Sequence, residues 1–134
     1  MKVVLDADLV IGALDGSDAH HARARALFED WREQEVPRLI SVVNLTEILV
    51  GPAAQSGQLR AAREAVAALG VTIHRPSEAI GVEAARLRNR HPISVPDAYC
   101  LATAKHVSGS VASFDEKVVR AAVAEELAQA VLAQ

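Results

Sequence analysis

The sequence predicts an α/β fold built around a parallel sheet. Short aliphatic runs alternate with longer segments that carry apolar residues at helical spacing, which is typical of strands joined by helical crossovers. The first run, VVL at residues 3–5, is apolar throughout, as in a strand buried on both faces. The chain has 134 residues, 51% of them hydrophobic, so it is long and apolar enough to bury a core.

The first half of the chain is predicted to contain two strands and two helices. Asp18 is a good N-cap for the longer helix, whose apolar stripe includes Phe28 and Trp31 and which ends before Pro37. The expected elements are a strand at 2–6, a short helix at 7–14, a helix at 19–34 and a strand at 38–41.

The second half continues the alternation. Gly51-Pro52 ends one helix, Gly70 ends the next, Ser77 caps a third and Pro96 lies in the first turn of a fourth, as helix boundaries favour. The expected helices are at 42–51, 57–70, 77–91, 96–106 and 115–122, and the expected strands at 71–74 and 109–114. The tail at 125–134 is predicted to be helical, with a final edge strand at 130–133 as the alternative. We therefore expect four or five strands.

Composition restricts the function classes. No linker, repeat or low-complexity segment is present, so we expect one domain over residues 1–134. No apolar run approaches the roughly 20 residues of a membrane span, and the first residues lack the pattern of a signal peptide. The lone cysteine, Cys100, excludes an internal disulfide, and we expect a cytoplasmic protein with no membrane partner. The net charge of −3 means that a nucleic-acid partner would need a local positive surface.

Four acids occur where the fold would bring them together. Asp6 ends the first strand and Asp115 follows the fourth, while Glu47 and Asp97 each share a helical stripe with apolar residues. In a parallel sheet, ligands bind beyond the carboxyl ends of the strands. Two charges about 4 Å apart repel by roughly 4 kcal/mol at an effective dielectric near 20. A hard divalent cation such as Mg²⁺ or Mn²⁺ cancels this repulsion and can activate water.

Three of the acids in these segments also have a purely structural alternative. Asp115 and Asp8 are placed to cap helices, and Asp97 suits the dipole in a first helical turn. Glu47 lies past the first turn, and Asp6 follows a buried strand that has no structural need of it. The metal-site hypothesis therefore depends on the set of acids.

Four segments resemble the PIN-domain family, specifically the VapC-type toxins of bacterial toxin–antitoxin pairs. They are VVLDADLVIGAL, SVVNLTEILVG, SVPDAYCLATA and SFDEKV, and they follow the family's order across nearly the whole chain. The resemblance implies a PIN-like three-layer fold, in which a sheet lies between helices, and endonucleolytic cleavage of RNA that depends on Mg²⁺ or Mn²⁺. It further implies an RNA substrate, a VapB-type antitoxin bound in a groove near the early helices, and a homodimer.

The resemblance also implies roles for individual residues. Metal binding and catalysis, with a metal-bound water as the nucleophile, fall to Asp6, Glu47, Asp97 and Asp115. Ser113 matches a small hydroxyl residue often found before the last acid. Asp8 departs from the family, which usually has Ser, Thr or Asn there. It would either hydrogen-bond near Asp6 or add a fifth charge to the site.

Other candidate residues have competing interpretations. Arg88 and Arg90 precede the Asp97 loop and are candidate contacts for RNA phosphates, the alternative being a solvated helix end. Cys100 is expected to be a buried structural cysteine. The histidines show no spacing typical of zinc ligands.

Three other functions compete with the nuclease interpretation. A haloacid-dehalogenase-type phosphatase would use Asp6 as nucleophile and Asp8 as acid and base, but the chain is short and lacks the later lysine and paired-aspartate motif. The second rival is a PIN-like module that binds RNA or a protein without catalysis. A receiver domain is disfavoured because the third strand, in VTIHRP, ends without an aspartate.

Overall fold

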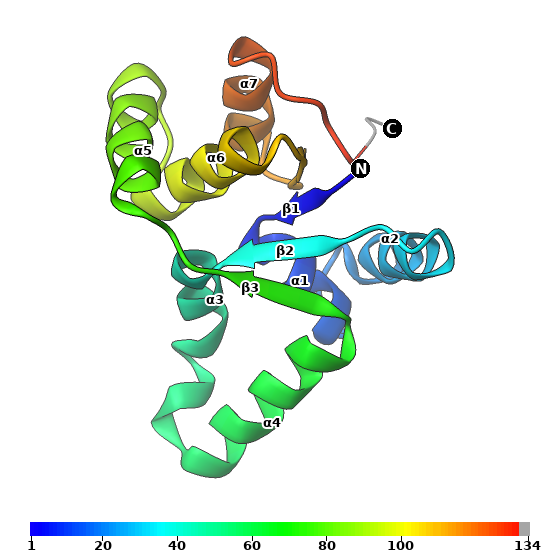
Figure 1. Ribbon diagram of the computed structural model, residues 1–134. Helices are drawn as coiled ribbons and strands as arrows, with labels where there is room; N and C mark the ends of the chain where they lie inside the picture. The colour runs from blue at the N-terminus through cyan, green and yellow to red at the C-terminus, as the bar shows by residue number, and fades with distance from the viewer. Residues whose placement is uncertain (132–134) are drawn as a thin grey trace.

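A four-stranded parallel sheet forms the centre of the protein (Figure 1). The computed structural model describes residues 1–131. Its strands are β1 (Val3–Leu5), β2 (Arg38–Ser41), β3 (Val71–His74) and β4 (Ser110–Ala112), in the order β3-β2-β1-β4. Val3 on β1 lies opposite both Arg38 on β2 and Ser110 on β4. The strands lie at the predicted positions, which confirms the α/β fold with a parallel sheet.

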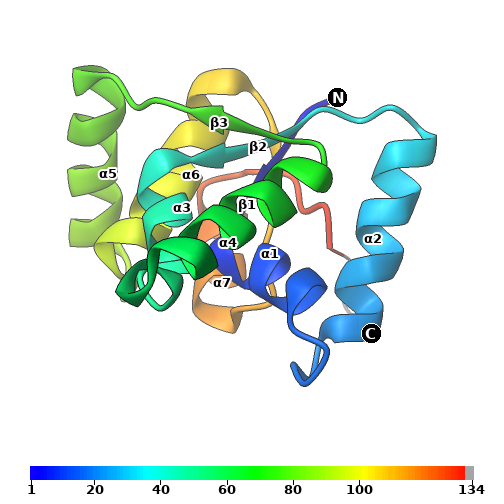
Figure 2. The same cartoon turned by 90° about the horizontal axis from the view of Figure 1, so that it is seen from below.

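Helices cover both faces of this sheet. They are α1 (Ala7–Leu14), α2 (His21–Glu33), α3 (Val42–Leu49), α4 (Ser56–Ala68), α5 (Glu78–Arg90), α6 (Val95–Val107) and α7 (Glu116–Ala124), with a 3-10 turn at Pro52–Ala54. Figures 1 and 2 show α5, α6 and α7 on one side of the strands and α1, α3 and α4 on the other. None of the helices within residues 1–131 combines the length and apolar character needed to cross a bilayer.

Successive residues of β1 supply two separate cores. Val3 and Leu5 pack with residues of α1 to α4, whereas Val4 packs with residues of α5, α6 and α7. This alternation follows from the period of two in a strand. It explains why every residue of β1 is apolar, and it confirms the predicted three layers.

Side-chain caps determine where several helices begin. The hydroxyl of Ser77 accepts from the N–H of Ile80 at 3.3 Å, as predicted. Asp18 was expected to cap the helix that follows it, but α2 begins only at His21. The Asp18 carboxylate instead accepts from the N–H of His20 at 2.8 Å and closes the turn ahead of the helix.

The helical prediction for the tail was wrong over residues 125–131, the part of the tail that the structure describes. Helix α7 ends at Ala124, and Glu126 has a positive φ of 61°. Beyond it, the N–H of Val111 donates to the carbonyl of Ala128 at 2.9 Å, and Ala130 donates back to Val111 at 2.8 Å. The tail thus pairs briefly with the open edge of β4, because unpaired backbone groups at a sheet edge favour such contacts. The alternative strand at 130–133 lies partly outside the described residues.

The end of α7 is fastened to α5 and α6 by ion pairs around one carboxylate. Glu125 accepts from Arg90 at 3.0 and 3.2 Å and from Lys105 at 2.8 Å. The Nε2 atom of His91 lies 2.6 Å from the same carboxylate. These three partners lower the pKa of Glu125 to about 2. The charge of Glu125 therefore holds three elements together.

Candidate acidic site

The carboxyl ends of β1 and β4 mark the expected ligand position. From β1 the chain continues to β2 on one side, while β4 lies on the other side, so the connections diverge between β1 and β4. Asp6 follows β1 directly and Ser113 follows β4 directly. The Ser113 hydroxyl donates to Oδ2 of Asp6 at 2.7 Å. A carboxylate thus stands at the switch point of the sheet.

Asp6 is buried and held by two hydrogen bonds. It is 5% exposed, and its Oδ1 accepts from the N–H of Ala7 at 2.9 Å, so it is also the N-cap of α1. Burial, followed by the charges of Asp8 and Asp97, raises the pKa of Asp6 to about 7, and the hydrogen bonds with Ser113 and Ala7 oppose this rise. A nearby cation would stabilise the charged form of such a group.

Asp8 lies beside Asp6 and does not cap α1. Its Oδ2 accepts from the N–H of Phe114 at 3.0 Å and lies 3.4 Å from the Ser113 hydroxyl. Its Oδ1 is buried without a hydrogen-bond partner. Burial is the main cause that raises the pKa of Asp8 to about 6, and the charge of Asp115 adds to it. Asp8 therefore both hydrogen-bonds near Asp6 and adds a charge.

Asp97 and Glu47 approach the same region from two helices. Asp97 forms a capping box with Ser94, in which each side chain accepts from the other's backbone N–H at 3.2 Å. Its charge raises the pKa of Asp6 and, after burial, that of Glu47. Glu47 itself is exposed. On the apolar stripe suggested for Glu47, Val43 is half-buried and Val50 is 68% exposed.

Asn44 is a site residue that the sequence analysis missed. It is fully buried, and its Nδ2 donates to Oε1 of Glu47 at 3.3 Å and to the carbonyl of Pro96 at 3.0 Å. Its Oδ1 is buried without a partner. Asn44 thus connects Glu47 on α3 with the residue before Asp97 on α6. The available signal was an amide in the first turn of an apolar helix, three residues before an acid.

Asp115 caps α7 and lies at the outer side of the cluster. Its Oδ1 accepts from the N–H of Lys117 at 2.8 Å, and its own N–H donates to the Ser113 hydroxyl at 3.0 Å. The capping alternative therefore holds for Asp115. Its charge nevertheless reaches Asp8, so capping and membership of the acidic cluster coexist.

Cys100 shows how closely the acids gather. The thiol is fully buried, as expected for a structural cysteine. Burial raises its pKa well above the ordinary value, and four acids raise it further: Asp6, Asp8, Asp97 and Glu47. Coulomb interactions fall with distance, so these four carboxylates, which come from three segments, all lie within electrostatic reach of the Cys100 thiol.

The donors fit a hard divalent cation chemically, but they are not arranged as a closed ligand shell. They are oxygen ligands that repel one another, and Oδ1 of Asp8 lacks a partner. Within residues 1–131, no group of three or more His, Cys, Asp or Glu side chains stands close enough to hold a metal. A Mg²⁺ ion keeps several water ligands, so it needs few direct protein ligands.

The two candidate RNA-binding arginines differ in their surroundings. Arg90 is engaged by Glu125 at 3.0 Å and by Glu83 at 3.5 Å. Arg88 is exposed and lines a pocket with Val95 and Tyr99. Arg88 is therefore the more available of the two for a phosphate.

Comparisons with known proteins agree with this architecture. The PIN-domain family model matches residues 3–124. A toxin–antitoxin complex from Klebsiella pneumoniae shares 25% identity, with a TM-score of 0.69 over 87% of this chain and 88% of that one. The Mycobacterium tuberculosis toxin VapC20, which cleaves the sarcin–ricin loop, shares 20% identity, with a TM-score of 0.72 over 90% of this chain and 95% of that one. VapBC-1 from Haemophilus influenzae shares 16% identity, with a TM-score of 0.71 over 96% of each chain.

A comparison with curated proteins gave no match. Toxins of the VapC type are generally nucleases, and nucleases with a PIN domain generally use divalent metal ions. The family match covers most of the chain, and the solved structures that share the fold include VapC-type toxins. The chain therefore belongs to the PIN-domain family, with the fold of its VapC-type toxins.

Proposed function

We propose that the protein is an endoribonuclease that depends on Mg²⁺ or Mn²⁺ and acts as the toxin of a type II toxin–antitoxin pair. The observation that carries this proposal is the electrostatic coupling among acids that include Asp6 at the switch point, because the charges of neighbouring acids raise the pKa values of Asp6, Asp8 and Glu47. Mutual repulsion of this kind is relieved by a divalent cation. The proposed ligands and catalytic residues are Asp6, Glu47, Asp97 and Asp115.

The proposed roles follow from how each side chain is held. Ser113 orients the Asp6 carboxylate, and Asn44 positions Glu47. Asp8, with an unpartnered oxygen, is a second candidate ligand. A cation bound here would supply Lewis-acid stabilisation and an activated water. The protein residues would hold the cation and orient the phosphodiester, and the positive charge of the cation would favour the deprotonated carboxylates.

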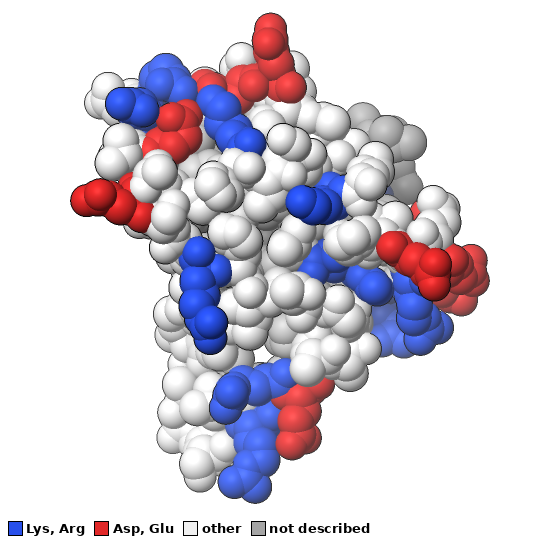
Figure 3. Space-filling view, viewed as in Figure 1, with Lys and Arg blue, Asp and Glu red and all other residues white. Residues whose placement is uncertain are grey.

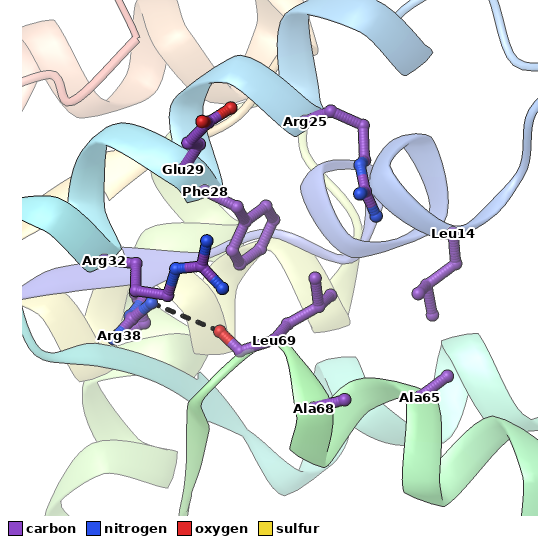
Figure 4. A pocket seen from close by; sticks show the side chains of 9 residues that line it. All are labelled: Leu14, Arg25, Phe28, Glu29, Arg32, Arg38, Ala65, Ala68 and Leu69. Carbon is purple, nitrogen blue, oxygen red and sulfur yellow. Dashed lines mark hydrogen bonds between the residues drawn. The ribbon is translucent and has the colours of Figure 1, made fainter.

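A groove between α2 and α4 is the proposed binding site for the antitoxin. It has a volume of about 460 Å³, and its lining includes Phe28, Leu69, one acid, Glu29, and three arginines, Arg25, Arg32 and Arg38. Figure 4 shows Arg25 and Arg32 projecting from α2 toward the groove, and Arg38 donating to the Leu69 carbonyl at 3.3 Å. An amphipathic segment with acidic residues suits such a surface. The Klebsiella protein was solved as a toxin–antitoxin complex.

Three further parts of the proposal concern assembly and organisation. We propose a homodimer through α3, α5 and α6, where Val42, Val82 and Val95 are 39%, 46% and 53% exposed and where exposed apolar residues favour an interface. We treat residues 1–134 as one PIN domain because both cores share the same sheet. The unpaired Cys100 fits a cytoplasmic protein.

The test is cleavage of total RNA by the purified protein with Mg²⁺ or Mn²⁺, compared with Asp97→Asn. Asparagine can still accept from the N–H of Ser94, so the capping box survives while the charge is lost. The exposed Asp30→Asn on α2 is the matched control and should cleave normally. RNA binding without cleavage by the wild type would favour the inactive binding module, and equal cleavage by Asp97→Asn would refute the metal site. The family match leaves the phosphatase alternative without support.

A further inference from the structure

A small basic and aromatic cluster stands at the beginning of α2. The rings of His20 and Phe114 stack, with centroids 4.3 Å apart and planes inclined by 13°. The guanidinium carbon of Arg23 lies 5.4 Å from the centre of the same Phe114 ring. His20 and Arg23 are three residues apart and so lie on one face of the helix end. The cluster of His20, Arg23 and Phe114 joins segments that are distant in sequence.

This cluster adjoins the acidic site directly. The N–H of Phe114 donates to Oδ2 of Asp8 at 3.0 Å. The charge of His20 acts on Asp8 and lowers its pKa, against the rise that burial causes. The other main influences on Asp6, Asp8 and Glu47 are burial, hydrogen bonds and neighbouring acids. His20 is therefore a basic side chain placed beside the acids.

An RNA strand needs such groups, because its phosphates are repelled by the acids and by a net charge of −3. On the face shown in Figure 3, basic and acidic side chains alternate in small groups instead of forming one continuous basic surface. Arg90 is occupied by Glu125. Basic side chains close to the acids would therefore help to attract the strand.

We propose that the cluster of His20, Arg23 and Phe114 is a subsite for the RNA nucleotide next to the scissile phosphate. His20 is exposed and its ring is covered by Phe114 on one face, so a base stacks on the other face. Arg23 attracts the adjoining phosphate, since a guanidinium is always charged. Phe114 is a positioning residue that holds the His20 ring. This inference rests on the proposed nuclease function.

The imidazole of His20 makes no capping hydrogen bond to α2, so its removal leaves the helix start intact. His20→Ala is expected to raise KM for a short labelled single-stranded RNA about tenfold with kcat nearly unchanged, because one stacked base is lost. His20→Phe keeps an aromatic face and should restore most of the affinity. Arg23→Gln should reduce the slope of log affinity against log salt by about 0.7, the value for one contact to a single strand.

Arg60→Gln on α4, outside all these contacts, is the control and should match the wild type. The inference is overturned if His20→Ala leaves KM unchanged, if only kcat falls, or if the salt slope of Arg23→Gln equals that of Arg60→Gln. Cleavage by the wild type and its loss in Asp97→Asn test the nuclease function separately. If the wild type binds the labelled RNA without cutting it, weaker binding by His20→Ala still supports the subsite, and equal binding overturns it.

Discussion

Replacement of Asp6 by asparagine is expected to stabilise the metal-free protein at alkaline pH. Burial and neighbouring acids raise the pKa of Asp6 from 3.8 to about 7. Because the pKa is higher in the folded state, the protonated Asp6 stabilises the fold fully below the pKa of the unfolded state, and this stabilisation is lost as the pH rises through the pKa of the folded state. The rise in pKa from 3.8 to about 7 corresponds to a loss of about 4 kcal/mol in the free energy of unfolding, at about 1.36 kcal/mol per pKa unit. Asp8, with a pKa of about 6, adds in the same direction.

The assay is urea unfolding of wild type and Asp6→Asn with a chelator present, at about pH 5 and about pH 8. The amide can still accept from the N–H of Ala7 and can donate to the Ser113 hydroxyl. The wild type should lose several kcal/mol between the two pH values, and most of this loss should disappear in Asp6→Asn. Asp30→Asn, on the exposed side of α2, should behave like the wild type.

Addition of Mg²⁺ at about pH 8 extends the same experiment. A cation that binds the charged carboxylates of the folded state stabilises it by linkage, so the wild type should regain stability and Asp6→Asn should not. The reasoning fails if Asp6→Asn is no more stable than the wild type at the higher pH. It also fails if the variant gains equally at both pH values, because a packing effect would not depend on pH.

Two further substitutions test features outside the main carboxylates. Asn44→Ala removes the amide that joins Glu47 to the Pro96 carbonyl. It should lower the free energy of unfolding by about 1–3 kcal/mol and the rate of RNA cleavage about tenfold. Normal cleavage by the destabilised variant would show that Asn44 only supports the fold. Glu125→Gln should lower the free energy of unfolding by about 1 kcal/mol near neutral pH, and this difference from the wild type should vanish as the pH falls toward about 2, where Glu125 becomes protonated. The control is Glu116→Gln, whose ion pair with Arg120 is highly exposed, and a loss of the same size in this control would contradict the prediction.

The fold could be predicted because its signals are local. The apolar run at Val3–Leu5 and the alternation of strands with helices identify a parallel sheet, and its topology then brings Asp6 and Ser113 to one edge. The tail could not be predicted in the same way. Its helical pattern is overridden by backbone hydrogen bonds between Val111 and residues 128 and 130, which depend on an edge that exists only after folding.

Candidate site residues could be predicted where they follow the ends of strands. They could not be predicted where their role depends on which side chains pair in the folded protein. Asp6 could be inferred because a carboxylate after a buried strand needs a reason. Asn44 could not, since its two partners lie three and fifty-two positions away and the longer pairing has no sequence signal. Arg90 looked available for RNA, but Glu125, thirty-five residues later, binds its guanidinium. The partners of surface charges are set by tertiary packing.

The short contact between the tail and β4 also governs how copies of the protein can meet. With one rim of the sheet already occupied by residues 128–130, the rim formed by β3 is the remaining place within residues 1–131 where a foreign strand can add. A chain that ended before Ala128 would leave the β4 edge unpaired as well, so that strands of other copies could add to the sheet at both edges. Residues 128–130, which form only an isolated bridge, thereby leave one sheet edge fewer for pairing between copies.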